Sequence, residues 1–482
     1  MATAPARGSE GPDNSFNTQE EAVSYATIKT TRVSAATEAT LAAEKPRPDF
    51  VPASDYISPE FLQLENERLW PKAWQMACRE EEIPKVGDYV TYEIAGESLV
   101  VMRVAPNQIK SFYNVCTHRG RRLQEGFGHA ANFYCRYHGW TWNLQGENTY
   151  IQDPEDWHGC PGVDKDSLRL RETRVDTWGG FVFVNMDPEA PPLAEYLAPV
   201  QEYLDPFEID KMRYRWYVSV KVPSNWKVGL EAFNEGYHVY TTHPQVRGVS
   251  DDITRSQAHG DHSNFGYPTA RPGGAPSART GAPIPTDFRE PIITMYDALS
   301  KQLNAMWTER DAEAVRRLRT ELRPNASPEE AWMKTYEVIK EAWEASGAGF
   351  PRATLMDLFK AGMDWHIFPN LIILPQFCGA LVYRVRPDGD NPDHCIFEVY
   401  SLQRYAPGAE PPLKRRYMWG PEEYKQFGEE VSIIQHQDFA NMSEVQQGMK
   451  SRGFPGCRPN PLQETAVYNL HRVIHRYLFG TD

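Results

Sequence analysis

Short, mostly apolar runs of β-type residues alternate with polar turns between Trp74 and Asp187. The runs are separated by turn residues and cover 89–94, 98–104, 108–114 and 179–185. Short runs of this kind, bounded by turn residues, are typical of strands. The pattern therefore predicts a compact antiparallel β-domain over residues 74–187.

The remaining chain mixes helical and strand-like spacing and predicts a second domain. Apolar residues at helical spacing predict helices over 58–74, 226–240, 327–347 and 462–478. The third of these begins with a Ser-Pro-Glu-Glu capping box at Ser327 and stops at Gly347. Strand-like runs predict a second sheet from 213–222, 365–374, 380–385 and 394–405. We assign residues 49–73 and 188–482 to this domain, which makes the chain an α+β protein.

Two segments fit neither pattern. Residues 1–48 are rich in Ala, Thr, Ser and Glu, so burial cannot offset their chain entropy and we expect a disordered arm. Gly, Pro and Ser are frequent over 256–291, which is too long for a simple connection. That segment is either a disordered insert or a lid over a pocket, and its flanking residues favour the lid.

Charge and cysteine content narrow the setting in which the protein works. The 482 residues include 51 Lys and Arg against 65 Asp and Glu, a net charge of −14 that argues against nucleic acid or an anionic membrane as partner. The most apolar stretches, 181–184 and 371–375, have the length of strands, so no transmembrane helix is expected. Seven cysteines and the absence of an apolar leader segment predict a reducing cytoplasm. Five cysteines lack metal-ligand spacing and are expected to be structural: Cys78, Cys160, Cys378, Cys395 and Cys457.

Two loops of the predicted β-domain each offer one thiol and one imidazole. Cys116 and His118 stand in the sequence CTHRG, and Cys135 and His138 stand in CRYHGW. A zinc site is one interpretation, but zinc fingers place their two His three to five residues apart on a helix and pair their two Cys on a hairpin. One Cys and one His from each loop instead suit a [2Fe–2S] cluster in which two Cys hold one iron and two His hold the other. Such a cluster accepts and passes single electrons.

A second group of candidate ligands follows about 100 residues later. Glu235 and His238 are three residues apart and would share one helical face. His238 and His243 are five residues apart, about 140° around a helix, so one straight helix could not aim both at one metal. Pro244 disfavours helix at His243, and a helix ending near Tyr240 would let His243 turn back. Two imidazoles and a distant carboxylate would form a non-haem Fe(II) site with positions open for O₂; the alternative is a pair of ordinary surface histidines.

With both groups in place, residues 50–480 resemble the large (α) subunit of Rieske non-haem iron ring-hydroxylating oxygenases. The Cys-Thr-His-Arg-Gly and Tyr-His-Gly-Trp contexts agree with the oxygenase or ferredoxin branch, because the chain lacks the extra loop cysteines of respiratory Rieske subunits. The resemblance implies a Rieske β-domain and a catalytic domain of the helix-grip, START-like type. It also implies two cofactors, a Rieske [2Fe–2S] cluster and a mononuclear Fe(II).

The resemblance assigns ligands by position. The expected cluster ligands are Cys116, His118, Cys135 and His138, and the two expected iron imidazoles are His238 and His243. The third iron ligand should fall within 437–446, where a D-x-x-N pattern matches Asp438 and Asn441. Asp438 is the expected ligand, and Glu444 is the alternative.

Glu235 stands where most aromatic-ring dioxygenases of this family have Asp. In the family this carboxylate joins a cluster His of one subunit to an iron-binding His of the next, which implies a homotrimer in which His138 meets Glu235 of its neighbour. Glu at this position resembles members that act on quaternary ammonium compounds.

The resemblance implies a hydroxylase that uses O₂ and electrons from a separate NAD(P)H-dependent reductase or ferredoxin, with or without a small β subunit. The chain has neither a G-x-G-x-x-G unit nor plant-type ferredoxin cysteines, which supports a separate electron donor. An aromatic substrate is the first expectation, and a monooxygenase or demethylase acting on a non-aromatic or quaternary ammonium compound is the alternative. An electron-transfer Rieske protein and a zinc-stabilised binding module remain as other classes. Candidate pocket residues are Phe233, Met306, Trp307, Phe350, His366 and Phe368.

Overall fold

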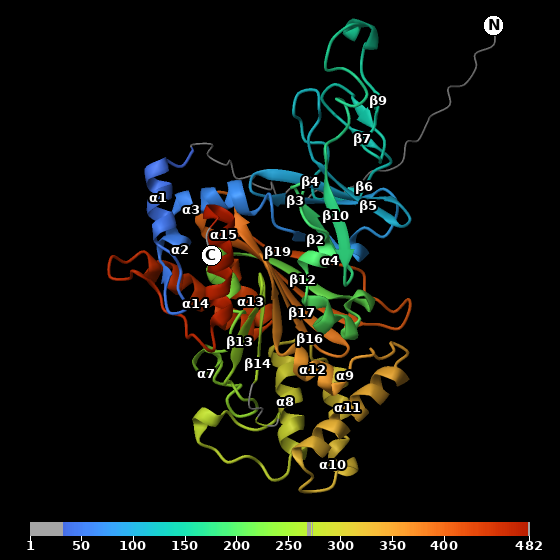
Figure 1. Ribbon diagram of the computed structural model, residues 1–482. Coiled ribbons are helices and arrows are strands. Elements are labelled where there is room, and N and C mark those ends of the chain that lie inside the picture. Colours follow the sequence, from blue (N-terminus) through green and yellow to red (C-terminus); the bar gives the residue numbers. More distant parts are fainter. Residues whose placement is uncertain (1–31, 268–270, 272, 481–482) are drawn as a thin grey trace, which may run out of the picture.

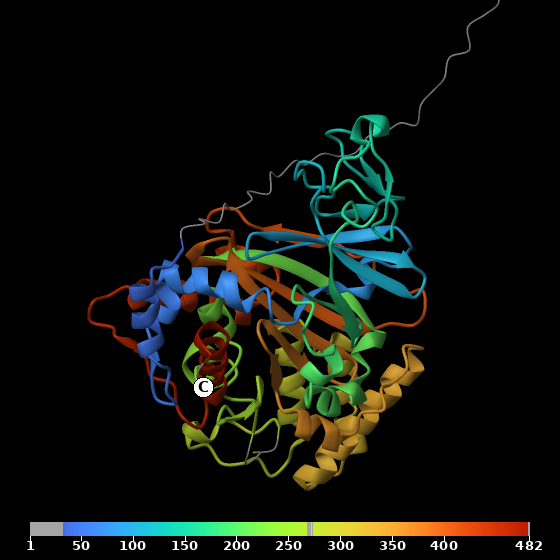
Figure 2. The same ribbon diagram turned by 45° about the horizontal axis from the view of Figure 1, so that its top comes forward.

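The computed structural model describes residues 32–267, 271 and 273–480, apart from the side chains of 429 and 430. Two antiparallel sheet systems lie next to each other, and helices cover the larger one (Figures 1 and 2). The predicted α+β class, with a β-domain and a second domain of sheet and helices, is confirmed.

The β-domain has a seven-stranded sheet and a small three-stranded sheet that rises above it (Figure 1). The large sheet has the order β2 (Gln75–Arg79), β11 (Phe181–Asn185), β10 (Glu172–Trp178), β5 (Gln108–Tyr113), β4 (Glu97–Ala105), β3 (Asp88–Ile94) and β6 (Phe127–His129). The small sheet has the order β7 (Phe133–Tyr134), β8 (Thr141–Trp142) and β9 (Asn148–Tyr150). A separate apolar core between the two sheets contains Cys116, Cys135 and Trp140, so both predicted cluster loops rest on this core.

The second domain is built on an eight-stranded sheet. Its order is β13 (Arg255–His259), β14 (His262–Gly266), β15 (Asp364–Ile367), β16 (Leu371–Pro375), β17 (Gly379–Asp388), β18 (Asn391–Arg404), β12 (Met212–Val222) and β19 (Arg415–Met418). All neighbouring strands are antiparallel except β12 and β19. The central strands β16 and β17 are almost wholly buried, as expected for a sheet covered on both faces.

Helices cover this sheet in two groups (Figures 1 and 2). The group at one end consists of α8 (Arg289–Gln302), α9 (Glu309–Val315), α10 (Leu318–Glu321), α11 (Pro328–Ala345) and α12 (Leu355–Ala361). The other group consists of α6 (Trp226–Glu231), α7 (Val239–Thr242), α14 (Ile433–Met449) and α15 (Thr465–Phe479). Within it, α6 contacts β17 and β18, and α14 contacts α6.

The segment before the β-domain belongs to the second domain. It contains α2 (Ser54–Ile57), α3 (Pro59–Leu64) and a π-helical turn, η1 (Glu65–Leu69). A two-residue strand, β1 (Val51–Pro52), pairs with β20 (Gly456–Cys457) near the end of the chain. The β-domain is therefore inserted within the second domain.

The expected disordered arm over 1–48 is wrong for its last part, whereas residues 1–31 lie outside the described residues. A helix, α1 (Ala35–Ala43), begins at Ser34, whose side chain accepts a hydrogen bond from the backbone N–H of Thr37. Leu41 is buried, and Arg68 bonds Glu38 at 2.7 Å. One buried leucine and a bidentate ion pair thus attach α1 to the domain, although the composition of this segment alone is too polar to predict folding.

The predicted helix over 226–240 is interrupted. After α6 ends at Glu231, the chain forms a turn and becomes helical again only at Val239. Within the turn, the Glu235 carboxylate accepts hydrogen bonds from the backbone N–H groups of Tyr237 and His238, which replace the bonds of a continuous helix. Glu235 and His238 therefore meet through a turn and not on one helical face.

Three other elements differ in their extent. The predicted strand 365–374 is divided into β15 and β16, and the first part of the Gly/Pro-rich segment 256–291 forms β13 and β14 at the edge of the sheet. The predicted helix 58–74 passes into the π-helical turn η1 and ends at Leu69.

A buried ion pair fastens the N-terminal segment to α6. Lys227 Nζ lies 2.6 Å from Glu65 Oε1, and both side chains are fully buried. We expect Lys227→Met to lower the free energy of unfolding by about 3–5 kcal/mol, because it leaves an unpaired carboxylate in the core. The double variant Lys227→Met/Glu65→Gln should recover most of this loss, since Gln still accepts the hydrogen bond from Trp226 Nε1. Urea unfolding measures both, and equal stability of Lys227→Met and the wild type would contradict the prediction.

Candidate metal centres

The two predicted cluster loops have the same backbone form. In the first, the Gly120 N–H donates to the Cys116 carbonyl at 3.0 Å; in the second, the Gly139 N–H donates to the Cys135 carbonyl at 2.9 Å. Both glycines have positive φ, 75° and 74°, which side chains other than glycine rarely adopt. Each turn thus closes around one Cys and brings the two loops side by side.

The loops bring two thiols and two imidazoles together. The thiols of Cys116 and Cys135 are buried, and the His118 and His138 rings lie with their centroids 4.6 Å apart. His118 also stacks on Trp140, with the ring centroids separated by 4.5 Å. Nδ1 of each histidine is buried and has no hydrogen-bond partner among the described residues. Two buried thiols and two unpartnered ring nitrogens fit the ligand set of a Rieske cluster.

The second predicted site lies between the turn after α6 and the helix α14. Asp438 Oδ1 lies 3.1 Å from His243 Nε2 and 3.5 Å from His238 Nε2. Potential ligand atoms of these three residues all fall within 4.8 Å of one another. Asp438 and His243 are buried, and His238 is partly exposed. Two imidazoles and one carboxylate are the donor set that suits a non-haem iron with open positions.

Each imidazole is oriented by a partner on its other nitrogen. His238 Nδ1 lies 2.5 Å from Glu235 Oε1, and His243 Nδ1 lies 2.8 Å from Gln437 Oε1. With Nδ1–H donated to these oxygens, both Nε2 lone pairs are available to a metal. The role of Gln437 was not predicted from the sequence, although its place next to Asp438 on α14 is a signal that could have revealed it.

The charge of this site is concentrated on carboxylates. Burial alone would lower the pKa of His238, but the neighbouring Glu235 and Asp438 raise it to about 9. Without a metal, the carboxylates therefore favour a protonated imidazole. A divalent cation would take the place of that proton between the same groups.

Other residues singled out near Asp438 lie outside this group. Glu444 is exposed on α14, so the alternative iron ligand is not with the two imidazoles. The predicted D-x-x-N partner, Asn441, donates to Thr242 Oγ1 at 3.4 Å and so connects α14 with α7.

A cavity of about 790 Å³ opens onto the second site. Its wall includes Glu235, His238, His243 and Asp438. Of the residues proposed for a pocket, Phe233, Met306 and Trp307 line it. The other three do not: Phe350 packs on Tyr336 and Phe377, His366 is buried beside Pro369, and Phe368 stacks on Tyr477.

The two candidate metal sites are far apart within the chain. The small sheet with β7 and β9 projects from the top of the molecule in Figure 1, whereas α7 lies at the opposite side, beyond the large sheet. The turned view in Figure 2 keeps the same separation. The segment with β7 and β9 and the helix α7 therefore lie on different sides of the molecule.

Two family models match the sequence. One describes a Rieske [2Fe-2S] domain and matches residues 73–161. The other describes the ring hydroxylating alpha subunit (catalytic domain) and matches residues 209–480, which is more than half of the chain.

Curated proteins with significant similarity are oxygenase subunits. The carnitine monooxygenase oxygenase subunit of Escherichia coli (strain K12) is 33% identical over 221 residues, 45% of this chain and 57% of that protein. The glycine betaine monooxygenase oxygenase subunit of Pseudomonas aeruginosa (strain UCBPP-PA14) is 28% identical over 214 residues, 43% of this chain and 48% of that protein. The biphenyl 2,3-dioxygenase subunit alpha of Rhodococcus jostii (strain RHA1) is 31% identical over 198 residues, 39% of this chain and 42% of that protein. The chain thus matches about half the length of these relatives.

Solved structures share the fold along nearly the whole chain. The quaternary ammonium Rieske monooxygenase CntA has a TM-score of 0.59 at 18% identity and covers 94% of this chain and 99% of its own. Naphthalene 1,2-dioxygenase has a TM-score of 0.57 at 18% identity and covers 90% of this chain and 94% of its own. Within the described part of the chain, no helix has the length and apolar character needed to cross a membrane.

Proposed function

Because the chain belongs to the ring hydroxylating alpha subunit family, we propose that it is the oxygenase component of a Rieske system. The component takes electrons from a separate NAD(P)H-dependent reductase, directly or through a ferredoxin, and hydroxylates an organic substrate with O₂. The cofactors of the family are a Rieske [2Fe–2S] cluster, which passes single electrons, and a mononuclear iron, which supplies the oxidising chemistry with O₂. The observation that carries the proposal is the pairing of a Cys₂His₂ loop set with a separate His₂Asp group in one chain.

The residues divide between these centres. In this proposal the cluster is held by Cys116, His118, Cys135 and His138, and the iron by His238, His243 and Asp438. Glu235 and Gln437 hold the two iron imidazoles with Nε2 toward the metal. The cavity supplies a largely apolar space beside the iron ligands, where a substrate can lie.

We propose that the working unit is a homotrimer, with or without a small β subunit, in which His138 of one subunit meets Glu235 of the next. Glu235 supports this role because its Oε1 already bonds His238 on the iron side. The exposed side chains Tyr137 and Tyr237 flank these two contact residues, 55% and 48% exposed, and exposed aromatic groups are typical of interfaces. The solved structure of a quaternary ammonium Rieske monooxygenase with the same fold gave insight into inter-subunit electron transfer in that protein.

The cavity favours an aromatic or other largely apolar substrate of considerable size. Aromatic, thioether and aliphatic side chains make up most of its wall, and Met333, Met356 and Phe359 at its edge are more than half exposed. A volume of about 790 Å³ lies in the range that accepts a drug-sized molecule. An exposed apolar rim of this kind suits a substrate that enters through apolar contact.

The charged groups on the wall are engaged with the protein. Asp252 is paired with Arg279, and Asp251 Oδ1 accepts the backbone N–H groups of Asp252 and Ala278. Arg271 Nη1 donates to two backbone carbonyls at 3.1 Å. Because Arg271 already donates to backbone carbonyls, fewer of its N–H groups are available to bind the carboxylate of a small zwitterion.

A quaternary ammonium compound is the second candidate substrate, and the relatives fit it better than an aromatic compound. Two of the relatives described above are named for carnitine and glycine betaine, and Glu235 resembles members of the family that act on such compounds. Aromatic rings on the cavity wall, such as Tyr296, Trp307 and Tyr383, could accept an alkylammonium group by cation–π contact.

We also propose a division of the chain into domains and a location of the protein in the cell. Residues 74–187 form the Rieske domain, and residues 49–73 and 188–482 form the iron domain. We place the protein in the cytoplasm, where a reducing environment keeps its seven cysteines from forming disulfides.

Turnover should depend on an added reductase. The purified chain, loaded with iron and cluster, is expected to yield no product with NADH alone, because the sequence has no nucleotide-binding unit of its own. With a reductase and ferredoxin added, a screen of polycyclic arenes, biphenyls and L-carnitine under ¹⁸O₂ should yield labelled product from the apolar compounds. Turnover with NADH alone would contradict a separate electron donor, and label only in carnitine-derived product would favour the second candidate.

A further inference from the structure

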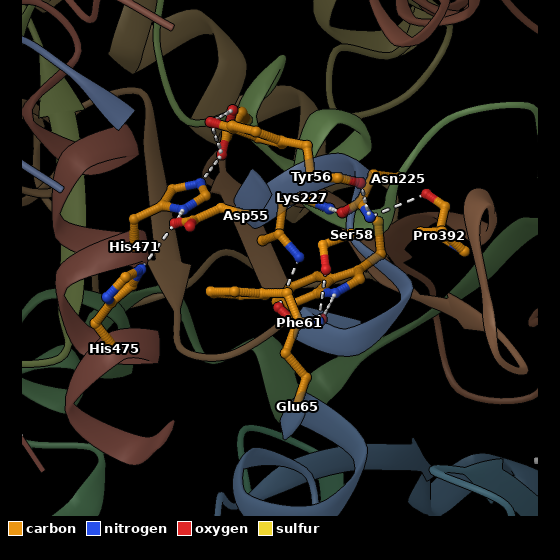
Figure 3. A network of polar contacts seen from close by, with 12 residues as sticks. Asp55, Tyr56, Ser58, Phe61, Glu65, Asn225, Lys227, Pro392, His471 and His475 are labelled. Carbon is orange, nitrogen blue, oxygen red and sulfur yellow. Dashed lines mark hydrogen bonds and ion pairs between the residues drawn. The ribbon is translucent and has the colours of Figure 1, made fainter. Parts of the chain in front are cut away.

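A buried network of polar side chains joins α2, α6 and α15 (Figure 3). The turn that carries Glu235 follows α6. His471 of α15 is the centre of the network. His471 Nδ1 lies 2.7 Å from Asp55 Oδ2, and His471 Nε2 lies 2.7 Å from Glu231 Oε1. His471 is fully buried and Asp55 nearly so, and the Glu231 side chain is 12% exposed.

The geometry requires a charged imidazole. A neutral imidazole has one N–H donor and one acceptor nitrogen, whereas an ionised carboxylate only accepts. Both ring nitrogens of His471 face carboxylates, so both contacts are hydrogen bonds only when the ring carries two protons. Burial opposes this charge, but Asp55 and Glu231 outweigh it and raise the pKa of His471 to about 9.

Other titratable groups face the same network from each element around it. The Tyr56 hydroxyl donates to Glu231 at 3.0 Å, and His475 Nε2 lies 3.0 Å from Asp55 Oδ2. Cys457 on β20 and Glu464 before α15 lie within electrostatic reach of Glu231, and Glu65 within reach of Asp55. Burial, together with Glu235 and Glu231, raises the pKa of Glu464 to about 7. The imidazolium of His471 is therefore the group that bonds both Asp55 and Glu231.

The network bears on the site through α6. The beginning of this helix is held by Asn225, whose Nδ2 donates to the Tyr56 carbonyl at 2.7 Å and to the Pro392 carbonyl at 3.0 Å (Figure 3). The end of the helix is Glu231, and Glu235 follows after a turn of three residues. Glu231 is thus the last residue of the helix before the carboxylate that bonds His238.

We propose that His471 is a positioning residue for Glu235: held between Asp55 and Glu231, it fixes the end of α6 and with it the turn that presents Glu235 to a neighbouring subunit. This inference rests on the proposed function, because the position of Glu235 matters for electron passage only if the two centres communicate through it. His471 does not touch the metal ligands and is not a catalytic residue.

The test compares His471→Gln with His475→Gln in the full-length holoenzyme. His475 lies on the same helix, is equally buried and contacts the same Asp55, but no contact joins it to Glu231 among the described residues. The measurement is the rate at which the dithionite-reduced cluster is reoxidised in air-saturated buffer. The rate of chelator-treated protein is subtracted from that of iron-loaded protein, so that only electron passage to the iron is counted. We expect a fall of about tenfold or more in His471→Gln, the effect typical of lost outer partners, and less than about twofold in His475→Gln.

The pH dependence of the stability and of the iron-dependent rate provides a second test, because a role of His471 in packing alone would not change it. In the wild type, stability from the charged contacts is complete below about pH 6.5 and is lost as pH rises through about 9, and the iron-dependent rate should decline over the same range. His471→Gln should remove this alkaline decline from both the melting temperature and the rate. If His471→Gln does not fold, Glu231→Gln should reproduce the slow rate, since it removes the charge and keeps the hydrogen bond from Tyr56.

Two results would overturn the inference: a wild-type rate and pH profile in His471→Gln, or equal losses in the two His variants. A wild-type protein without any iron-dependent reoxidation would instead refute the proposed function, and the alkaline loss of stability would still report on the charge of His471.

Discussion

Asp438→Ala is expected to abolish product formation while the visible absorbance of the Rieske cluster stays unchanged. Asp438 supplies the carboxylate of the candidate iron site, and His238 and His243 supply its two imidazoles. Losing an outer partner of a metal ligand typically costs 10–100-fold, and losing the ligand itself should cost more than about 100-fold. The cluster loops stand on a separate core, so the change should not reach them.

Glu444→Ala is the matched control for this prediction. Glu444 lies on the same helix and is exposed, so its removal should leave iron content and product formation within about twofold of the wild type. Iron per chain, measured by elemental analysis, should fall from three toward two in Asp438→Ala alone. Full activity in Asp438→Ala, or loss of activity only in Glu444→Ala, would transfer the ligand role to another residue.

Glu235→Gln should retain both metal centres but lose most electron passage between subunits. The Glu235 carboxylate bonds His238 Nδ1 and also accepts two backbone N–H groups of its own turn. Gln has nearly the same shape, but its neutral amide is a weaker partner for an imidazole that must be held with Nδ1–H inward. We expect the rate of iron-dependent cluster reoxidation to fall by about 100-fold or more.

Glu235→Asp tests whether charge or length matters at this position. Asp keeps the carboxylate but shortens the side chain by one methylene, so it should recover part of the rate that Gln loses. Rapid-mixing absorbance of the cluster follows each variant, and iron content controls for loss of metal. Substantial reoxidation in Glu235→Gln would remove the bridging role from this residue.

The sequence predicted well those features that depend on local pattern. Short β-type runs bounded by turns located β3, β4, β5 and β11, although only β3 alternates between buried and partly exposed residues. The capping box at Ser327 located α11 within one or two residues. The side chains of the candidate ligands His238, His243 and Asp438 lie together, although 195 residues separate His243 from Asp438 and only the family resemblance linked them.

Features that depend on hydrogen bonds from the backbone to side chains could not be predicted from local pattern. The helical spacing of 226–240 is real, but the Glu235 carboxylate satisfies two backbone N–H groups and interrupts the helix. Gln437 orients His243 across the interface between α14 and the turn, and no local pattern identifies such a contact.

Contacts between distant segments were also beyond sequence patterns. Asp55 and His471 are 416 positions apart, yet they lie 2.7 Å from each other. Composition suggested that 35–43 is disordered, but docking through Leu41 and Glu38 supplies what local propensity lacks. Such contacts exist only after the whole second domain has assembled.

Because one domain is inserted within the other, the two domains are expected to fold in a fixed order during synthesis on the ribosome. The strands of the β-domain come from one continuous stretch, Gln75–Asn185, so this part can fold while synthesis continues. The surrounding domain has to wait, because β1 needs β20 and Asp55 needs His471 from the final helix. Nascent chains should therefore pass through a stage in which the electron-carrying module is already formed while the oxygen-handling module still awaits its last hundred residues or so.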